Sequence, residues 1–232
     1  MAAMVRLLII LVPLLILATY GPGWWVRRTL AKYSQPEERY QGSGGELARH
    51  LLNQRGLHKV AVEVTESGDH YDPEARAVRL TSGNYHGRSL TAVTVAAHEV
   101  GHAIQHAEGY APLRLRGELV RWAASGQRLG AFLMLAIPVI TILTRHPAPG
   151  AMFLLAGLLS MGLAAIVHLV TLPTELDASF NRALPILRDG GYLYETDYPH
   201  AQRILKAAAY TYVAQSLMSL LNIWAWLRFL RR

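Results

Sequence analysis

Long runs of apolar residues dominate the pattern of this chain. A helix that crosses a membrane needs about 20 residues of this kind. There are four such runs. The second and third are separated only by residues 144–150, so we expect them to form a helical hairpin. The fourth contains several polar residues, and its alternative is a helix that lies at the membrane interface. The four candidate membrane-spanning helices are Val5–Val26, Leu129–Leu143, Ala151–Val170 and Ala207–Leu227.

Between the first apolar run and residue 90 the pattern becomes that of a small α+β region. Residues 44–56 fit a short helix that is closed by a C-terminal glycine. Apolar and polar residues alternate in Val60–Val64, and a second strand is predicted at Ala77–Leu80. A turn at Ser67–Pro73 joins the two predicted strands, so we expect a β-hairpin.

One apolar helix carries the candidate chemistry, because residues 90–97 lead directly into the HExxH motif His98-Glu99-Val100-Gly101-His102. Histidines at positions i and i+4 project from the same helix face and can bind one Zn²⁺. The carboxylate of Glu99 can then reach an activated water rather than the metal, where a general base must stand. The alternative is a chance placement of three polar residues on an amphipathic helix.

A catalytic zinc site needs three protein ligands and an open position, and the best third ligand is Glu175. Because Pro173 cannot continue a helix, we expect Thr174 to be an N-cap and Glu175 to lie in the first turn. Glu175 could alternatively be a carboxylate favoured by the helix dipole alone. His106 and His168 are weaker candidates for the third ligand.

The chain resembles the YugP-like family of membrane-bound neutral zinc metallopeptidases, distant relatives of the HtpX-type zincins. The resemblance implies that His98, His102 and Glu175 bind zinc and that Glu99 is the catalytic acid and base. Ser179 stands where the HtpX pattern has an aspartate, and a hydroxyl orients an imidazole less firmly than a carboxylate does. The motifs that carry the resemblance, within about residues 45–214, are 70–73, 85–90, 96–106, 109–114 and 172–179.

The fold predicted from these patterns is a mainly α membrane protein, with a zincin-like α+β catalytic core and about four transmembrane helices. The core combines the HExxH helix with the small β-hairpin. The histidines precede the predicted hairpin of helices and Glu175 follows it, so two crossings return the chain to the same side. The predicted segments are a membrane anchor (1–28), the first half of the zincin domain with the HExxH helix (29–127), the helical hairpin (128–171), the second half with the third ligand (172–206) and a C-terminal transmembrane or interfacial helix (207–232).

Composition and charge agree with a membrane enzyme. Hydrophobic residues make up 52% of the 232 residues and charged residues 17%, and the net charge is +7. The basic residues flank the apolar runs, which favours attraction to lipid headgroups and argues against nucleic acid. Their bias predicts a multi-pass protein of the inner cell membrane with its catalytic domain in the cytoplasm, although the basic tail at 228–232 opposes this. The absence of cysteine excludes disulfides, thiolate ligands and a cysteine nucleophile.

The predicted function is zinc-dependent hydrolysis of peptide bonds in a protein or peptide substrate, with one Zn²⁺ per chain. The predicted partner is the lipid bilayer, and one biological role that fits is the quality control of membrane proteins. The alternatives are a silent zinc-binding scaffold and a hydrolase of a non-peptide amide or lipid. The strand Ala77–Leu80 could be an edge strand whose backbone pairs with an extended peptide substrate. The alternative, with equal weight, is that it belongs to an ordinary hairpin of the core. Candidates for stabilising the oxyanion are His70, Tyr71, His200 and Tyr210.

Overall fold

The computed structural model describes residues 2–122 and 170–220, together with Ser125, Ile142, Leu143, Met152 and Val167. The chain divides into two compact units, one formed by Met1–Tyr110 with Leu172–Arg232 and the other by Ala111–Thr171. In the second unit, residues 111–122 are helical. The candidate residues of the HExxH motif and Glu175 all belong to the first unit, whose structure follows.

Helix α4 (Leu90–Ala107) lies at the centre of the first unit and is buried through Gln105. The helix begins at Ser89, whose hydroxyl accepts a hydrogen bond from the backbone N–H of Ala92 at 3.2 Å. It ends at Ala107, and the positive φ of Gly109 (66°) permits a Schellman motif, in which the N–H groups of Gly109 and Tyr110 donate to the backbone oxygens of His106 and Gln105. The predicted HExxH helix is therefore capped at both ends by local sequence.

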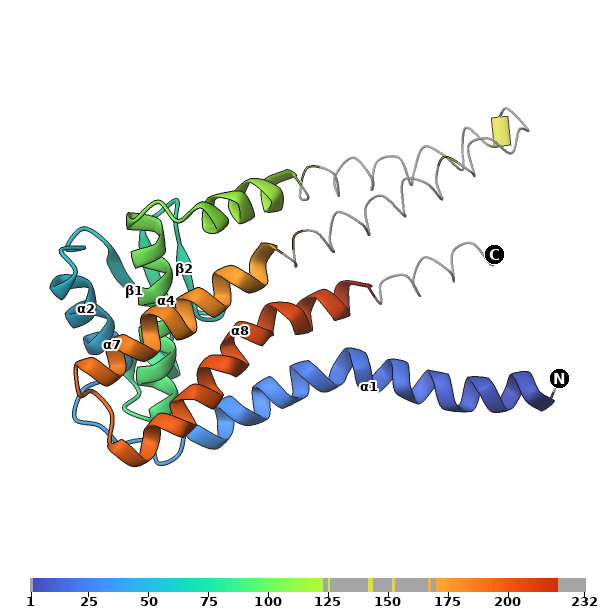
Figure 1. Cartoon of the computed structure of the whole chain (residues 1–232), viewed down its shortest axis with the longest axis horizontal. Helices are drawn as coiled ribbons and strands as arrows, with labels where there is room; N and C mark the ends of the chain where they lie inside the picture. Colours follow the sequence, from blue (N-terminus) through green and yellow to red (C-terminus); the bar gives the residue numbers. More distant parts are fainter. Residues whose placement is uncertain are drawn as a thin grey trace. The chain divides into compact units, whose positions relative to one another are not determined.

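The other helices of the first unit surround α4 (Figure 1). Fully buried side chains from α2, α7 and α8 pack with α4 into one core, and they include Leu51, Leu52, Leu187, Ile204 and Leu205. The bounds of these helices are α1 (Ala2–Tyr33), α2 (Gly44–Gln54), α3 (Ser82–His86), the π-helix η1 (Asp177–Ala183), α7 (Leu184–Asp189), the 3₁₀ turn η2 (Glu195–Asp197) and α8 (Tyr198–Leu220).

The small sheet has three strands in the order β1-β3-β2, and they are β1 (Ala61–Thr65), β2 (His70–Asp72) and β3 (Ala77–Thr81). The prediction of a hairpin between the first and last of these segments is wrong, because β1 pairs with β3 in parallel. The hairpin is formed by β2 and β3, which are antiparallel. Its turn follows Asp72, whose carboxylate accepts the backbone N–H groups of Glu74 and Ala75 at 2.9 and 3.0 Å.

The same pairing corrects the prediction that Ala77–Leu80 is an edge for an extended substrate. Strand β3 has hydrogen-bonded neighbours on both sides, so its backbone groups are already paired. The edges of the sheet are β1 and β2.

The predicted transmembrane helices and the multi-pass location in the cell membrane are also corrected. Within the described ranges, no helix is long and apolar enough to cross a membrane. Two of the predicted spans overlap α1 and α8. Helices α1 and α8 pack against each other. The predicted helical hairpin falls almost entirely outside the residues that the structure describes.

Candidate metal centre

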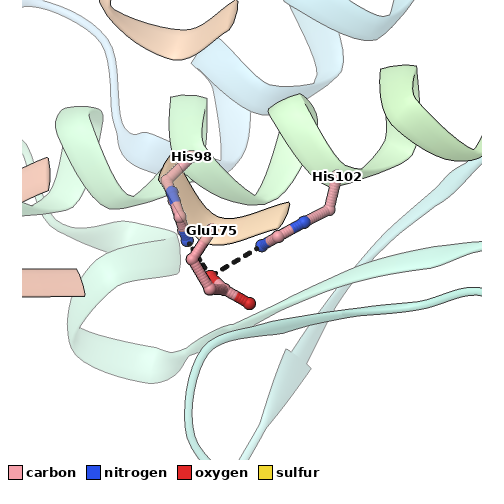
Figure 2. Close-up of side chains that lie close together, drawn as sticks. All are labelled: His98, His102 and Glu175. Carbon is pink, nitrogen blue, oxygen red and sulfur yellow. Dashed lines mark hydrogen bonds and ion pairs between the residues drawn. The ribbon is translucent and has the colours of Figure 1, made fainter. Parts of the chain in front are cut away.

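Three buried side chains from two distant parts of the chain meet beside α4. His98 and His102 point from one face of the helix towards Glu175, which is fully buried (Figure 2). The Nε2 atoms of both histidines lie 3.2 Å from the same carboxylate oxygen, Oε2 of Glu175. One potential ligand atom from each residue lies within 4.8 Å of the other two, and these are the residues that could hold a metal ion in the described part of the chain.

Glu175 reaches the histidines from a helical segment that differs from the predicted one. Residues 170–176 are helical through Pro173, so Thr174 is not an N-cap, and its side chain is fully buried. The helix then widens into the π-helix η1, which runs from Asp177 to Ala183. Single π-turns inside helices are frequent at functional sites.

Gly101 allows η1 to lie against α4. A Cβ added at Gly101 would lie 2.7 Å from the backbone oxygen of Ala178, a separation that real Cβ atoms do not adopt. The glycine within the HExxH motif therefore sets the distance at which Glu175 approaches the histidines.

We expect Gly101→Ala to lower the free energy of unfolding by about 1–3 kcal/mol, the usual cost of inserting a methyl group into a packed interface. Denaturant unfolding of the purified protein measures this loss. Gly83→Ala is the matched control, because a Cβ at Gly83 meets no atom within 4 Å and should change stability by less than about 0.5 kcal/mol. Equal stability of the two variants would contradict the role given to Gly101.

Gln105 determines which ring nitrogen of His102 carries the proton. The Nε2 amide group of Gln105 donates to the backbone oxygen of Thr174 and to Oδ2 of Asp177, both at 2.8 Å. Its Oε1 atom must then be the acceptor for Nδ1–H of His102, at 2.9 Å. The Nε2 atom of a neutral His102 is thus left with a lone pair that faces Glu175.

The carboxylate of Asp177 completes this set of hydrogen bonds. Burial raises the pKa of Asp177, but the hydrogen bonds from Gln105 and Arg182 outweigh it and hold the pKa below its usual range. Arg182 donates to Asp177 at 2.7 Å and to Glu108 at 2.6 Å. Asp177 therefore stays ionised at neutral pH and keeps the amide of Gln105 in one orientation.

Ser179 determines which ring nitrogen of His98 carries the proton, as Gln105 does for His102. Its hydroxyl donates to the backbone oxygen of Leu205 at 3.3 Å, which leaves the oxygen to accept Nδ1–H of His98 at 3.1 Å. The hydroxyl that replaces the carboxylate of the HtpX pattern therefore still orients the ring. Both histidines direct an Nε2 lone pair at Glu175.

The cluster needs a positive charge between these atoms. Burial raises the pKa of Glu175, but protons on the Nε2 atoms of His102 and His98 would supply this charge and hold the pKa well below its usual range. Two protonated imidazoles with ring centroids 4.8 Å apart would repel each other in a buried site. One divalent cation would satisfy all three side chains at once, so the residues present fit a metal.

The remaining candidates lie elsewhere or have other partners. His106 is not part of the cluster, because its Nδ1 atom lies 2.8 Å from the hydroxyl of Tyr71. Nδ1 of His70 bonds the backbone oxygen of Gly68 at 2.8 Å. His168 lies outside the residues that the structure describes.

Two further oxyanion candidates come from α8. Nδ1 of His200 lies 3.3 Å from the hydroxyl of Tyr33, and the two rings are stacked. Tyr210 is half-buried in the same helix. Neither belongs to the three-residue cluster.

The sequence reasoning missed Gln105 and Asp177. Both carry a signal that could have been used: Gln105 follows His102 by three residues, so the two share a helix face, and Asp177 follows Glu175 by two. An acceptor for the second ring N–H of a metal-binding histidine fixes the tautomer and the orientation of the imidazole.

Comparison with known proteins agrees with this geometry. The model of the family described as "Putative neutral zinc metallopeptidase" matches residues 7–231, nearly the whole chain. The chain belongs to this family. It is also 36% identical over 221 residues to the "Putative membrane protease YugP" of Bacillus subtilis (strain 168), which covers 90% of this chain and 92% of that protein. No solved structure matches the chain. The resemblance seen in the sequence motifs is thereby confirmed.

Proposed function

We propose that this protein is a metallopeptidase that holds one zinc ion per chain through His98, His102 and Glu175. The convergence of two imidazole nitrogens and one carboxylate oxygen in a buried site supports this most directly. Three such ligands leave the fourth position of a tetrahedral zinc ion open, as catalytic zinc sites require. Family membership supports zinc as the metal and a peptide or protein as the substrate.

The observed separations suit this metal. Ligand atoms at about 2.0–2.1 Å from a tetrahedral zinc ion are about 3.3 Å apart. The Nε2 atoms of His98 and His102 are each 3.2 Å from Oε2 of Glu175. Two of the three separations therefore match a tetrahedral zinc ion, and all three ligand atoms lie within 4.8 Å of one another.

Glu99 has the position of a general base. It lies on α4 directly after His98, is only 6% exposed, and is not one of the three clustered residues. Zinc, when bound, polarises the scissile carbonyl and lowers the pKa of a water towards ~7. The carboxylate of Glu99 takes the proton of the attacking water and passes it to the nitrogen of the leaving amine.

The test is hydrolysis of an unfolded protein by the purified chain, together with elemental analysis. We expect about one zinc per chain, the minimum for a mononuclear site. Activity should disappear with a chelator and return when zinc is added back. Proteolysis that survives complete removal of zinc, or a zinc-loaded protein that cleaves no peptide substrate, would overturn the proposal.

We expect Gln105→Met to weaken zinc binding by about 10–100-fold, the usual loss when a residue that orients a ligand is replaced. Methionine keeps the length of the buried side chain but cannot accept Nδ1–H of His102. Competition with a zinc-binding dye measures the change. Gln202→Met, an exposed position on α8, is the matched control and should bind zinc as the unmodified protein does. Unchanged affinity in Gln105→Met would show that Gln105 does not position His102.

A further inference from the structure

A cavity of about 430 Å³ lies beside the last two turns of α4. This volume falls in the range of small-molecule sites, about 300–1,000 Å³. Its walls come from the loop before β1, from the β2–β3 hairpin and from α4. The residues that line it are Gly56, Leu57, His58, Lys59, Val60, Tyr71, Arg76, Ala103, His106 and Ala107.

The cavity is basic. Lys59 and Arg76 lie on its walls with His58 and His106, and the lining includes no carboxylate. Neither Lys59 nor Arg76 forms an ion pair with any residue of the described ranges, whereas Arg79 on the neighbouring strand is paired with Asp72 and Glu63. The two unpaired cations therefore attract an anion from outside the chain.

Arg76 occupies a backbone conformation that arginine disfavours. Its φ is 51°, and it is the one non-glycine residue with a positive φ among those that the structure describes. Glycine or asparagine is easier to accommodate there. An arginine at this position places a charged side chain on the cavity wall in spite of an unfavourable backbone conformation.

The cavity adjoins the metal centre along one helix. Glu99, Ala103 and His106 are spaced i, i+4 and i+7, so the face that carries the proposed general base also lines the cavity. His106 follows His102 by one turn, a rise of about 6 Å along the axis. An extended peptide covers this distance with about two residues.

Tyr71 and His106 form a polar pair on the cavity wall. Burial raises the pKa of Tyr71 to about 12, so its phenol keeps its proton at neutral pH. When this hydroxyl donates to Nδ1 of His106, the proton of the neutral imidazole lies on Nε2 and adds a donor. Leu57, Val60 and Ala103 provide apolar wall for the hydrocarbon part of a ligand.

We propose that this cavity is a substrate subsite for a carboxylate, lying about two or three residues from the scissile bond. The carboxylate belongs either to the C-terminus of the substrate or to an aspartate or glutamate side chain, and Lys59 and Arg76 bind it. The inference rests on the proposed function, since it assigns a specificity to the same site.

The test compares matched peptides that differ in one negative charge. One pair has the same sequence with a C-terminal carboxylate or carboxamide. A second set has a carboxamide end and carries glutamate or glutamine at each of three positions on either side of the scissile bond. We expect the acidic member of at least one pair to have a kcat/KM about 10-fold higher, since a hydrogen bond to a charged group is typically worth 1.5–3 kcal/mol. Preference in the first pair identifies a terminal carboxylate, and preference in the second set identifies a side chain.

The acidic preference is the ratio of kcat/KM for the acidic peptide to kcat/KM for its neutral partner. The variant Lys59→Gln/Arg76→Asn should reduce this ratio towards unity. Asparagine tolerates the positive φ at position 76, so the fold should survive. The ratio is measured within one preparation, which cancels any change in overall activity. Lys206→Gln, an exposed position on α8, removes a charge outside the cavity and should leave the ratio unchanged. A ratio near unity in the unmodified protein, or a preference that survives in the double variant, would overturn the subsite.

A binding measurement separates this proposal from the proposed function. The same labelled peptides are titrated with zinc-loaded Glu99→Gln protein, and anisotropy reports their affinities. Tighter binding of the acidic peptides that is lost in the cavity variant supports the subsite, even if no peptide is cleaved. The absence of cleavage would then overturn only the proposed peptidase activity. Cleavage without acidic preference in rate or binding overturns only the subsite, and equal binding without cleavage overturns both.

Discussion

The Glu99→Gln protein is expected to keep its zinc and its fold while losing at least ~10²-fold of its peptide hydrolysis, the low end for removal of a general base. Glutamine has nearly the same shape as glutamate, so the buried position beside His98 remains filled. Its amide cannot accept a proton from the attacking water. Initial rates with a fluorogenic peptide, normalised to zinc content, measure the loss.

Glu66→Gln is the matched control for this prediction. Glu66 is exposed in the segment between β1 and β2, so the same chemical change there should leave the rate unaltered. A Glu99→Gln protein that hydrolyses peptide at a comparable rate would mean that the activity does not use this carboxylate.

The Glu175→Gln protein is expected to lose zinc, with an affinity that falls by more than the ~10–100-fold typical of residues that only orient ligands. Glu175 supplies the negative charge of the three-residue cluster and lies 3.2 Å from both imidazole Nε2 atoms. The substitution preserves the shape of a fully buried side chain, so zinc loss can be assigned to the missing charge. Elemental analysis after dialysis against trace zinc provides the measurement.

Each glutamate variant serves as the control for the other, because both replace a buried glutamate beside the proposed metal with glutamine. Zinc content should separate them: Glu99→Gln retains about one equivalent and Glu175→Gln does not. Full zinc retention by Glu175→Gln, or by Glu175→Ala, would exclude Glu175 as the third ligand.

The histidine pair could be predicted from sequence because its geometry is local. Four residues of helix fix the direction of both imidazoles, and the apolar residues before His98 indicate that the helix is buried. The prediction of Glu175 depends on a different argument, in which Pro173 interrupts a helix and Thr174 caps the next one. The structure brings Glu175 to the histidines although the helix passes through Pro173, so the predicted residue joins the cluster from a local structure that differs from the predicted one.

The pairing of the strands could not be predicted in the same way. The sequence predicts strands at 60–64 and 77–80, close to the observed 61–65 and 77–81, but it carries no information on which strands become neighbours. The three residues of β2 are too few to show alternation, and they were assigned to a turn. The membrane prediction rests on the clustering of apolar residues along the sequence, whereas no helix in the described ranges is long and apolar enough to cross a membrane.

The division of the metal centre between two chain segments has a consequence for synthesis. His102 and Glu175 are 73 residues apart, so a ribosome adding about 5–20 residues per second makes the third ligand roughly 4–15 s after the second. During that interval the nascent chain carries the HExxH helix without the carboxylate that completes the proposed ligand set. The proposed peptidase is therefore inactive throughout that interval of its synthesis.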